Sequence, residues 1–282
     1  MLIREALAQG RADLKFAGIA SAGLDADLLL SHVLKKDRAF LLSAGNESLS
    51  EKNCAAFCEL IEKRCEGICT AYLTGKKEFM GLEFAVNSSV LVPRPDTETL
   101  VEAALEIIDS KNINILDLCT GSGAVAIAIK NERPDTNVHA ADISEEALQI
   151  AKENSSRLLG ENQINFYHGD LFDAIPRSQS LYSLITANPP YIPSNEIQTL
   201  SAEVQNEPRI ALDGGISGLD IIKKIINDAP SFLQNGGALL MEADPRQIKD
   251  ITALLEAEEF VNIKIYKDLA GLDRVIGGKY EK

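Results

Sequence analysis

The 282-residue sequence has no apolar run approaching the ~20 residues of a membrane-spanning helix. Its first residues, MLIREALAQG, carry Arg4 and Glu5 where a secretory signal needs its apolar stretch. With 45% hydrophobic residues, the chain can still bury a substantial core. These features predict a globular, cytoplasmic protein with no membrane segment.

Basic residues are also scarce, since 28 Lys and Arg stand against 42 Asp and Glu, for a formal net charge of −14. Residues 1–75 carry 9 basic and 10 acidic side chains, which gives −1 there and −13 for the rest of the chain. Proteins that grip nucleic acid through its phosphates need the opposite balance. We therefore expect no direct nucleic-acid binding, whereas a protein partner or a small cationic ligand suits the acidic surface.

Cysteine is sparse, and its odd total of five, in a chain without a signal peptide, argues against a disulfide framework. Cys54, Cys58, Cys65 and Cys69 form two C-x3-C pairs, not the closer C-x2-C pairs of structural zinc sites. Residues i and i+4 of a helix share one face. We therefore predict small thiols packed at a helical interface, with a zinc site as the alternative, and we expect no metal at the functional site.

The chain changes character after its first 69 residues. Residues 1–69 have the apolar periodicity of short helices, with Ser50 placed to cap one of them. Residues 70–96 break this pattern, because Gly75 and Gly81 punctuate short apolar or aromatic runs. The sequence thus predicts a small helical domain followed by a β-hairpin linker.

From Thr97 to the end, runs typical of strands alternate with runs typical of helices. This alternation predicts an α/β fold with a doubly wound, seven-stranded sheet. Only the short connection LAGLD separates the last two strands, so one of them should run antiparallel to the rest. We expect strands at 113–118, 137–142, 163–167, 182–187, 237–242, 261–267 and 273–277, and helices at 97–109, 123–131, 144–158, 218–233 and 245–257.

The segment DLCTGSGA, residues 117–124, lies between a predicted strand and a predicted helix. Gly121 and Gly123 would let backbone N–H groups approach a ligand, and Asp142, at the end of the next strand, could accept hydrogen bonds from ribose hydroxyls. This arrangement predicts a nucleotide-cofactor site, with a ligand-free tight turn as the alternative. The segment also fits the G-x-G-x-x-A dinucleotide fingerprint, so an NAD-dependent oxidoreductase stays open.

Asp117 favours S-adenosylmethionine (SAM) over a dinucleotide. A carboxylate can face the cationic end of SAM, whereas it would repel a pyrophosphate. Its alternative role is to brace the loop.

Asp170, at the end of the third strand, is placed to reach an adenine amine with Leu171 against the ring, or is simply an exposed turn residue.

The segment ITANPPYIPS, residues 185–194, ends a strand on Asn188 and two prolines, which do not serve sheet pairing. The expected strand order puts Asn188 and the glycine loop at the same carboxyl edge, in one crevice. The Asn188 side-chain oxygen and the Pro189 carbonyl could both accept from an NH2 group, with Pro190 stiffening the loop and Tyr191 as a planar wall. We predict a clamp for a planar amide or base, with a rigid turn as the alternative.

Five segments, in order, resemble the HemK-type glutamine N5-methyltransferases that modify peptide-chain release factors. The likeness runs from about residue 70 to the end, and residues 1–69 match in type and position. It implies a class I methyltransferase in which SAM methylates the glutamine of a release factor's Gly-Gly-Gln loop. Together with the change of organisation and charge across residues 70–96, it gives three expected domains: 1–69 for docking, 70–96 as linker and 97–282 for catalysis. The segments are LVPRPDTETLVE (91–102), ILDLCTGSG (115–123), TANPPYIP (186–193), NEPRIALDGGISGLD (206–220) and DLAGLDRVIGG (268–278).

The resemblance also implies roles for single residues. Two positions depart from the family pattern, since Cys119 stands where many relatives have glycine and Leu272 replaces a frequent arginine. A methyltransferase for nucleic-acid bases, an NAD-dependent oxidoreductase and a SAM-binding adaptor remain as alternatives. The implied cofactor contacts are Asp117, Cys119, Thr120, Gly121, Ser122, Gly123, Asp142, Asp170, Leu171 and Asn188, and the implied substrate clamp is Asn188, Pro189, Pro190 and Tyr191.

Overall fold

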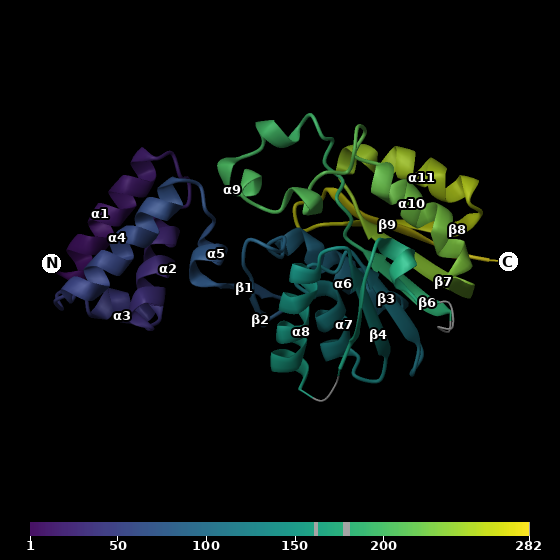
Figure 1. Ribbon diagram of the computed structural model, residues 1–282, viewed down its shortest axis with the longest axis horizontal. Helices are drawn as coiled ribbons and strands as arrows, with labels where there is room; N and C mark the ends of the chain where they lie inside the picture. The colour runs from purple at the N-terminus through teal and green to yellow at the C-terminus, as the bar shows by residue number, and fades with distance from the viewer. Residues whose placement is uncertain (161–162, 177–180, 282) are drawn as a thin grey trace. The chain divides into compact units, whose positions relative to one another are not determined.

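The computed structural model describes residues 1–160, 163–176 and 181–281 (Figure 1). The chain forms two compact units, one of residues 1–76 with 201–206 and one of residues 77–200 with 207–282. Among the described residues, no helix has the length and apolar character that crossing a membrane requires.

The first unit is helical, as predicted. Leu14, Leu29, Leu30 and Phe57 are buried in its core. The Ser50 hydroxyl accepts a hydrogen bond from the Asn53 amide at 3.2 Å and so caps the fourth helix, as the sequence suggested. The helices are α1 (Ile3–Phe16), α2 (Ala22–Leu34), α3 (Arg38–Ser43), α4 (Glu51–Cys65) and α5 (Thr70–Thr74), with α9 (Ala202–Gln205) added from much later in the chain.

The cysteines of this unit divide into two groups. Cys69 is buried and Cys54 half-buried, but Cys58 and Cys65 are exposed, so the prediction of interface thiols is wrong for these two. The buried residues of α4 are Phe57, Ile61 and Arg64, and the exposed Cys58 and Cys65 are not among them. Within the described part of the chain, no cluster of His, Cys, Asp and Glu is arranged to hold a metal ion.

A two-stranded hairpin of β1 (Lys76–Phe79) and β2 (Leu82–Ala85) lies within the region where a hairpin was expected. Its turn residues Met80 and Gly81 have φ values of 49° and 71°. Two successive positive φ values are the mark of the tight turns that suit the twist of a hairpin, and glycine adopts them without strain.

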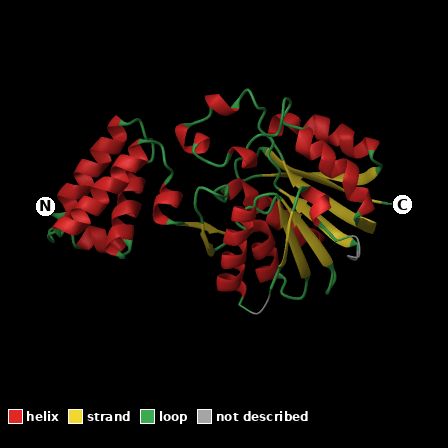
Figure 2. Cartoon of the chain, in the orientation of Figure 1, coloured by secondary structure: helices red, strands yellow, loops and turns green. Residues whose placement is uncertain are grey.

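The second unit contains a seven-stranded sheet in the order β5-β4-β3-β6-β7-β9-β8. β9 is antiparallel to both its neighbours, while the β5-β4-β3-β6-β7 pairs are parallel, which confirms the doubly wound α/β prediction. Helices cover both faces of the sheet (Figure 2). The strands are β3 (Asn114–Leu118), β4 (Asn137–Asp142), β5 (Asn165–His168), β6 (Tyr182–Ala187), β7 (Leu233–Glu242), β8 (Phe260–Lys267) and β9 (Asp273–Tyr280).

The helices of this unit fall into two groups, one on each face of the sheet (Figure 1). The first group is α6 (Glu98–Ile107), α7 (Ala124–Glu132) and α8 (Glu145–Leu159), and the second is α10 (Asp220–Asp228) and α11 (Ile248–Ala257). The helices of the second group bury Ile222, Ile225 and Ile251 against Leu116 and Ile185 of the central strands.

The register of the central strands determines where the site residues lie. Leu118 of β3 pairs with Ala141 of β4 on one side and with Ala187 of β6 on the other. The residues that follow these positions therefore leave the sheet at one level, at the carboxyl edge where open α/β sheets bind ligands. Asn188 and the glycine loop consequently lie beside each other, as the strand order predicted.

Candidate active site

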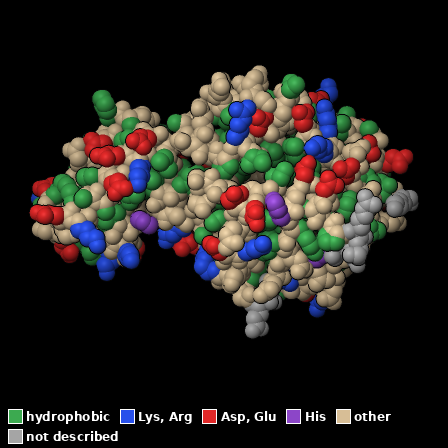
Figure 3. Space-filling model, viewed as in Figure 1, with side chains coloured by type: hydrophobic (Ala, Val, Ile, Leu, Met, Phe, Trp, Pro, Cys, Tyr) green, Lys and Arg blue, Asp and Glu red, His purple; other side chains and the backbone are tan. Residues whose placement is uncertain are grey.

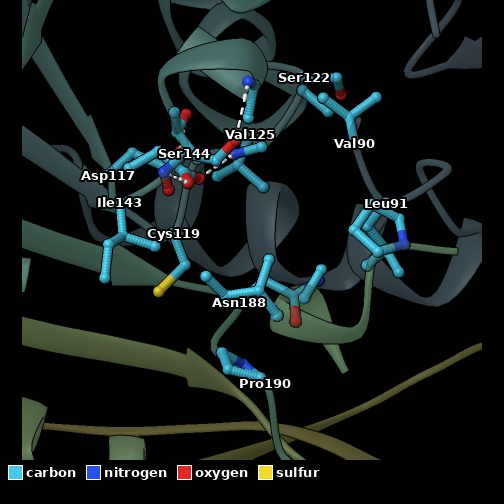
Figure 4. A pocket seen from close by; sticks show the side chains of 18 of the residues that line it. Val90, Leu91, Asp117, Cys119, Ser122, Val125, Ile143, Ser144, Asn188 and Pro190 are labelled. Carbon is cyan, nitrogen blue, oxygen red and sulfur yellow. Dashed lines mark hydrogen bonds between the residues drawn. The ribbon is translucent and has the colours of Figure 1, made fainter. Parts of the chain in front are cut away.

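A cavity of about 530 Å³ lies at this edge of the second unit. Figure 4 shows Cys119 of the glycine loop and Asn188 of the Asn-Pro-Pro-Tyr motif on its wall. Gly123, Pro189 and Tyr191 adjoin this wall in the chain but do not line it. The residues predicted from the sequence that do line it are Asp117, Cys119, Thr120, Gly121, Ser122, Asp142, Asp170, Leu171, Asn188 and Pro190.

The glycine loop is built from left-handed residues. Cys119, Gly121 and Gly123 have φ values of 55°, 55° and 80°. The loop therefore accepts a cysteine where many relatives have glycine, at a strain of roughly 1–2 kcal/mol for an L-residue. Gly123 adopts its φ of 80° without strain, and a Cβ there would also lie 3.2 Å from Ala151 Cβ of α8, so glycine suits the start of α7.

Asp142, the last residue of β4, holds this loop in place. Its Oδ2 accepts a hydrogen bond from the Gly121 amide at 2.8 Å, and its Oδ1 accepts one from the Ser144 amide at 2.9 Å. Burial raises the pKa of the Asp142 carboxyl, and these amide hydrogen bonds oppose that rise. Each carboxylate oxygen has a second lone pair, so Asp142 can still accept from a ligand.

Asp117 is almost fully buried, at 1% exposure, yet lines the cavity. Its carboxylate accepts hydrogen bonds from the hydroxyls of Thr120 at 2.7 Å and Thr186 at 2.8 Å. Burial raises its pKa to about 7, because these hydroxyls offset only part of the desolvation and the nearby Asp142 adds repulsion. A cationic ligand group in the cavity would stabilise the ionised form.

Asp170 and Leu171 complete this side of the cavity. Leu171 is buried and left-handed, with φ 49°, which turns the chain after β5. The Asp170 carboxylate is exposed and lies 3.4 Å from Lys224 Nζ. Three acids, Asp117, Asp142 and Asp170, therefore line one cavity, and their carboxylates can accept from hydroxyls and attract cations.

The Asn-Pro-Pro-Tyr motif is braced from behind by two residues that the sequence analysis did not single out. Asn188 Nδ2 donates a hydrogen bond to Thr97 Oγ1 at 3.3 Å, and the Tyr191 hydroxyl donates one to Glu242 Oε1 at 3.1 Å. The Tyr191 ring packs against the hydrophobic core of the sheet. A charged residue ending the apolar run ALLME was the only sequence signal for Glu242.

A second buried acid, Glu207, holds the segment that precedes α6. It forms an ion pair with Arg94, which lines the cavity, and accepts a hydrogen bond from the Val92 amide at 3.3 Å. Sequence reasoning assigned neither residue a role, although both lie in the segments that carry the family resemblance. Arg94 and Arg209 bring positive charge to a wall that also carries Asp117, Asp142 and Asp170.

A sheet of this order, with a glycine loop after β3 and an acid ending β4, defines the class of SAM-dependent methyltransferases. Two solved structures agree with this fold. A methyltransferase from Pyrococcus furiosus aligns with TM-score 0.54 at 16% identity, over 72% of this chain and 90% of that one. A 16S rRNA methyltransferase from T. thermophilus, in complex with AdoMet and guanosine, aligns with TM-score 0.51 at 19% identity, over 73% of this chain and 50% of that one. At such identities the likeness shows the fold alone.

The sequence comparisons are more specific. The PrmC N-terminal domain family matches residues 5–75, and the methyltransferase small domain family matches residues 95–215. The chain is 37% identical over 278 residues to the release factor glutamine methyltransferase of Clostridium acetobutylicum, covering 98% of both. It is 43% identical over 254 residues to the one of Coxiella burnetii, covering 90% of both. The chain therefore belongs to the family of release factor glutamine methyltransferases.

Proposed function

We propose that this chain transfers a methyl group from SAM to the side-chain amide nitrogen, N5, of the glutamine in the Gly-Gly-Gln loop of peptide-chain release factors. The proposal rests on one observation, that the predicted substrate residues and the predicted cofactor residues lie in one cavity. Asn188 and Pro190 line the same cavity as Asp117 and the glycine loop, in a chain of this family. Cofactor and amide substrate would therefore meet at one strand edge.

The residues of the cavity fit SAM, which supplies a methyl group on a positively charged sulfonium. Asp142 would accept from the ribose hydroxyls, and Asp170 and Leu171 would contact the adenine. The buried Asp117 would face the cationic amino end, whose charge would stabilise the ionised carboxylate against the burial that raises its pKa. Nothing lies within 4 Å of a Cβ placed on Gly121, so the backbone there is open to a ligand.

Catalysis on this wall is chiefly a matter of orientation. The Asn188 Oδ1 and the Pro189 carbonyl would accept from the two N–H groups of the substrate amide and direct its nitrogen at the methyl group. Such alignment is worth roughly 7–11 kcal/mol for well-oriented reactants. The same acceptors would stabilise the positive charge that develops on the nitrogen, and Pro190 and Tyr191 would keep the loop stiff.

The rest of the chain suits a protein partner. Residues 1–69 would dock the release factor, 70–96 would link, and 97–282 would carry the chemistry. On the face shown in Figure 3, Lys and Arg side chains are scattered among acidic ones, which supports a partner other than nucleic acid. A protein that modifies release factors works in the cytoplasm, where translation ends.

Transfer of tritiated methyl from SAM tests the proposal. Purified release factor, DNA and RNA would be offered separately to the full chain, and label is expected on the release factor. Label on nucleic acid alone would overturn the substrate assignment and favour a base methyltransferase.

A further inference from the structure

The backbone of the Asn-Pro-Pro-Tyr motif is held by a buried side chain to which the proposed chemistry gives no part. Gln247, 7% exposed, ends η6 (Pro245–Gln247), the short turn between β7 and α11. Its Nε2 donates hydrogen bonds to the Tyr191 carbonyl at 2.9 Å and to the Ser217 carbonyl at 3.3 Å. Both partners are acceptors, so only the NH2 end of this amide can face them. One side chain thus joins the end of the motif to the loop that precedes α10.

Two glycines of that loop pack directly against the backbone of the motif. A Cβ on Gly214 would lie 2.7 Å from the Pro190 carbonyl oxygen and 2.8 Å from Tyr191 Cα. A Cβ on Gly218 would overlap the Tyr191 carbonyl oxygen and lie 2.5 Å from Gln247 Nε2. Neither position has room for a side chain, so the loop lies in direct backbone contact with Pro190 and Tyr191.

The motif is therefore anchored at both ends. Ala187, which precedes it, pairs with both neighbouring strands, β3 and β7. At the other end, Gln247 holds the Tyr191 carbonyl. Between these ends the rings of the two prolines fix φ at about −65°, so few backbone angles stay free. The direction of the Pro189 carbonyl, a proposed acceptor for the substrate amide, then depends on where the two ends are held.

We propose that Gln247 is a positioning residue for methyl transfer, which holds the Tyr191 carbonyl so that Asn188 and the Pro189 carbonyl keep their places beside the cofactor. Figure 4 shows Asn188 and Pro190 on this wall of the cavity. The inference rests on the proposed function, because it matters only where the wall receives a substrate amide. Gln247 is not among the described residues that line the cavity, so it acts through the motif and not on SAM.

Gln247→Met in the full chain is the first test. Methionine is similar in length and unbranched but has no N–H, so the Tyr191 carbonyl loses this donor. We expect kcat on the release factor to fall about tenfold, as for loss of a buried hydrogen bond. The KM for the release factor and the Kd for SAM should each stay within about twofold, because the substitution alters neither the docking contacts nor the cofactor wall.

Lys130→Met is the matched control. Lys130 is also a buried donor to two backbone carbonyls, those of Pro134 at 3.0 Å and Thr136 at 2.6 Å. Thr136 directly precedes β4, so this contact lies at the amino edge of the sheet, away from the cavity. Both variants should unfold at a lower temperature, because each deprives two carbonyls of a donor. Only Gln247→Met should lose kcat when both are assayed well below their unfolding temperatures.

Gly214→Ala displaces the motif without changing Gln247. The added methyl group would meet the Pro190 carbonyl and Tyr191 Cα, so the motif backbone must shift. We expect kcat to fall at least about tenfold, because a small misplacement of oriented groups slows the reaction, while the Kd for SAM is unchanged. Gly23→Ala, where nothing lies within 4 Å of the added Cβ, is the control and should leave kcat unchanged.

The outcomes separate this inference from the proposed function. If the wild-type chain methylates no release factor, the proposed function fails and the positioning role fails with it. If the wild type is active, the positioning role alone is overturned by full kcat in Gln247→Met or in Gly214→Ala. It is equally overturned by the same loss of kcat in Lys130→Met, or by a loss of SAM affinity that matches the loss of kcat.

Discussion

At the scale of single residues, the proposed function assigns two tasks to different parts of the cavity wall. The acids Asp117 and Asp142 lie on the side of the glycine loop, and Asn188 lies at the end of the neighbouring strand β6. If the first two hold SAM and the third holds the substrate amide, their substitutions should affect different measurements. Binding and turnover can therefore be assigned to separate residues.

Asn188→Ala should remove most turnover and leave SAM binding nearly intact. The side chain is assigned to the substrate amide, so we expect kcat to fall by a factor of roughly 10²–10³, as for loss of one preorganised polar contact at a reacting group. Steady-state kinetics with the release factor and calorimetry with SAM measure the two effects. Near-normal kcat would show that Asn188 does not hold the substrate amide.

Asp142→Ala should instead weaken SAM binding, by roughly 10- to 100-fold for a lost pair of hydrogen bonds to a charged group. The loss also releases the Gly121 and Ser144 amides, which loosens the loop. Asp135→Asn, at an acid paired with Arg133, is the control for a change of charge alone. Unchanged SAM affinity on calorimetry would place the ribose contact elsewhere and reopen the dinucleotide alternative.

Asp117 predicts a pH dependence. Its folded-state pKa of about 7 lies above the ordinary 3.8, so the folded protein without ligand holds a proton that the unfolded chain releases. Stability of the free protein should therefore fall as pH rises from about 4 to about 7. SAM affinity should rise over the upper part of the same range, because a cation binds the ionised carboxylate.

Asp117→Asn should flatten both profiles. The variant should unfold at a higher temperature than the wild type at pH 8 without ligand, yet bind SAM roughly 10- to 100-fold more weakly for want of a charged partner. Thermal unfolding and calorimetry between pH 5 and pH 8 test this pair of effects. A variant that keeps the wild-type pH profile of SAM affinity would show that another group titrates.

At the scale of elements, the buried strands were predictable and the irregular ends were not. β3, β4 and β6 are short apolar runs that the sequence marks almost to the residue. The predicted helix 218–233 ends at Asp228 as α10, because Pro230 allows only a short 3₁₀ turn. β7 starts at Leu233, through the polar residues Asn235 to Gly237 that show no strand pattern.

The site shows the same division. Asn188 and the glycine loop were found because each carries its chemistry in a local pattern of residues. Thr97 and Glu242 were not assigned a role, because each contacts the motif only in the folded chain, Thr97 through Asn188 and Glu242 through Tyr191. Likewise, no local pattern indicates that residues 201–206 belong to the helical unit.

That late segment is attached through Arg64, which is 1% exposed. Its guanidinium lies 2.8 Å from Asp25 Oδ2 and also pairs with Glu203 of the segment. Arg64→Ala should destabilise the helical unit by about 3–5 kcal/mol, because it leaves the buried Asp25 charge unpaired. Glu203→Ala should lower stability by no more than about 1 kcal/mol, since Glu203 is 44% exposed.

Thermal unfolding compares the two variants, and hydrogen exchange follows residues 201–206 in each. Both variants should speed exchange in this segment, but only Arg64→Ala should lower the unfolding temperature markedly. Equal stability of the two would mean that Asp25 does not depend on Arg64.

At the scale of the whole molecule, charge and architecture divide along the chain. Residues 1–75 carry a net charge of −1 and the remainder −13, and the organisation changes from helices to alternating strands and helices. A flexible Gly-Gly-Gln loop needs contacts remote from the chemistry to raise its local concentration at the cavity. We infer that the helical unit supplies these contacts.

A fragment starting near Thr70 tests this docking role. It should bind SAM and methylate a short Gly-Gly-Gln peptide slowly, yet lose most of the rate advantage of the full chain on an intact release factor. Circular dichroism must first show that the fragment is folded, since it leaves residues 201–206 without the helices of their unit. If the folded fragment methylates the intact release factor as fast as the full chain does, residues 1–69 do not dock the release factor.

The central claim is that the cavity presents a glutamine side-chain amide to SAM. Its most direct measurement is mass spectrometry of an intact release factor after reaction with the full chain and SAM, with fragmentation that locates the added methyl group. The account predicts one methyl group on the side-chain amide nitrogen of the Gly-Gly-Gln glutamine, and none with Asn188→Ala over the same time. A methyl group on another residue, or an equal yield with Asn188→Ala, would contradict it.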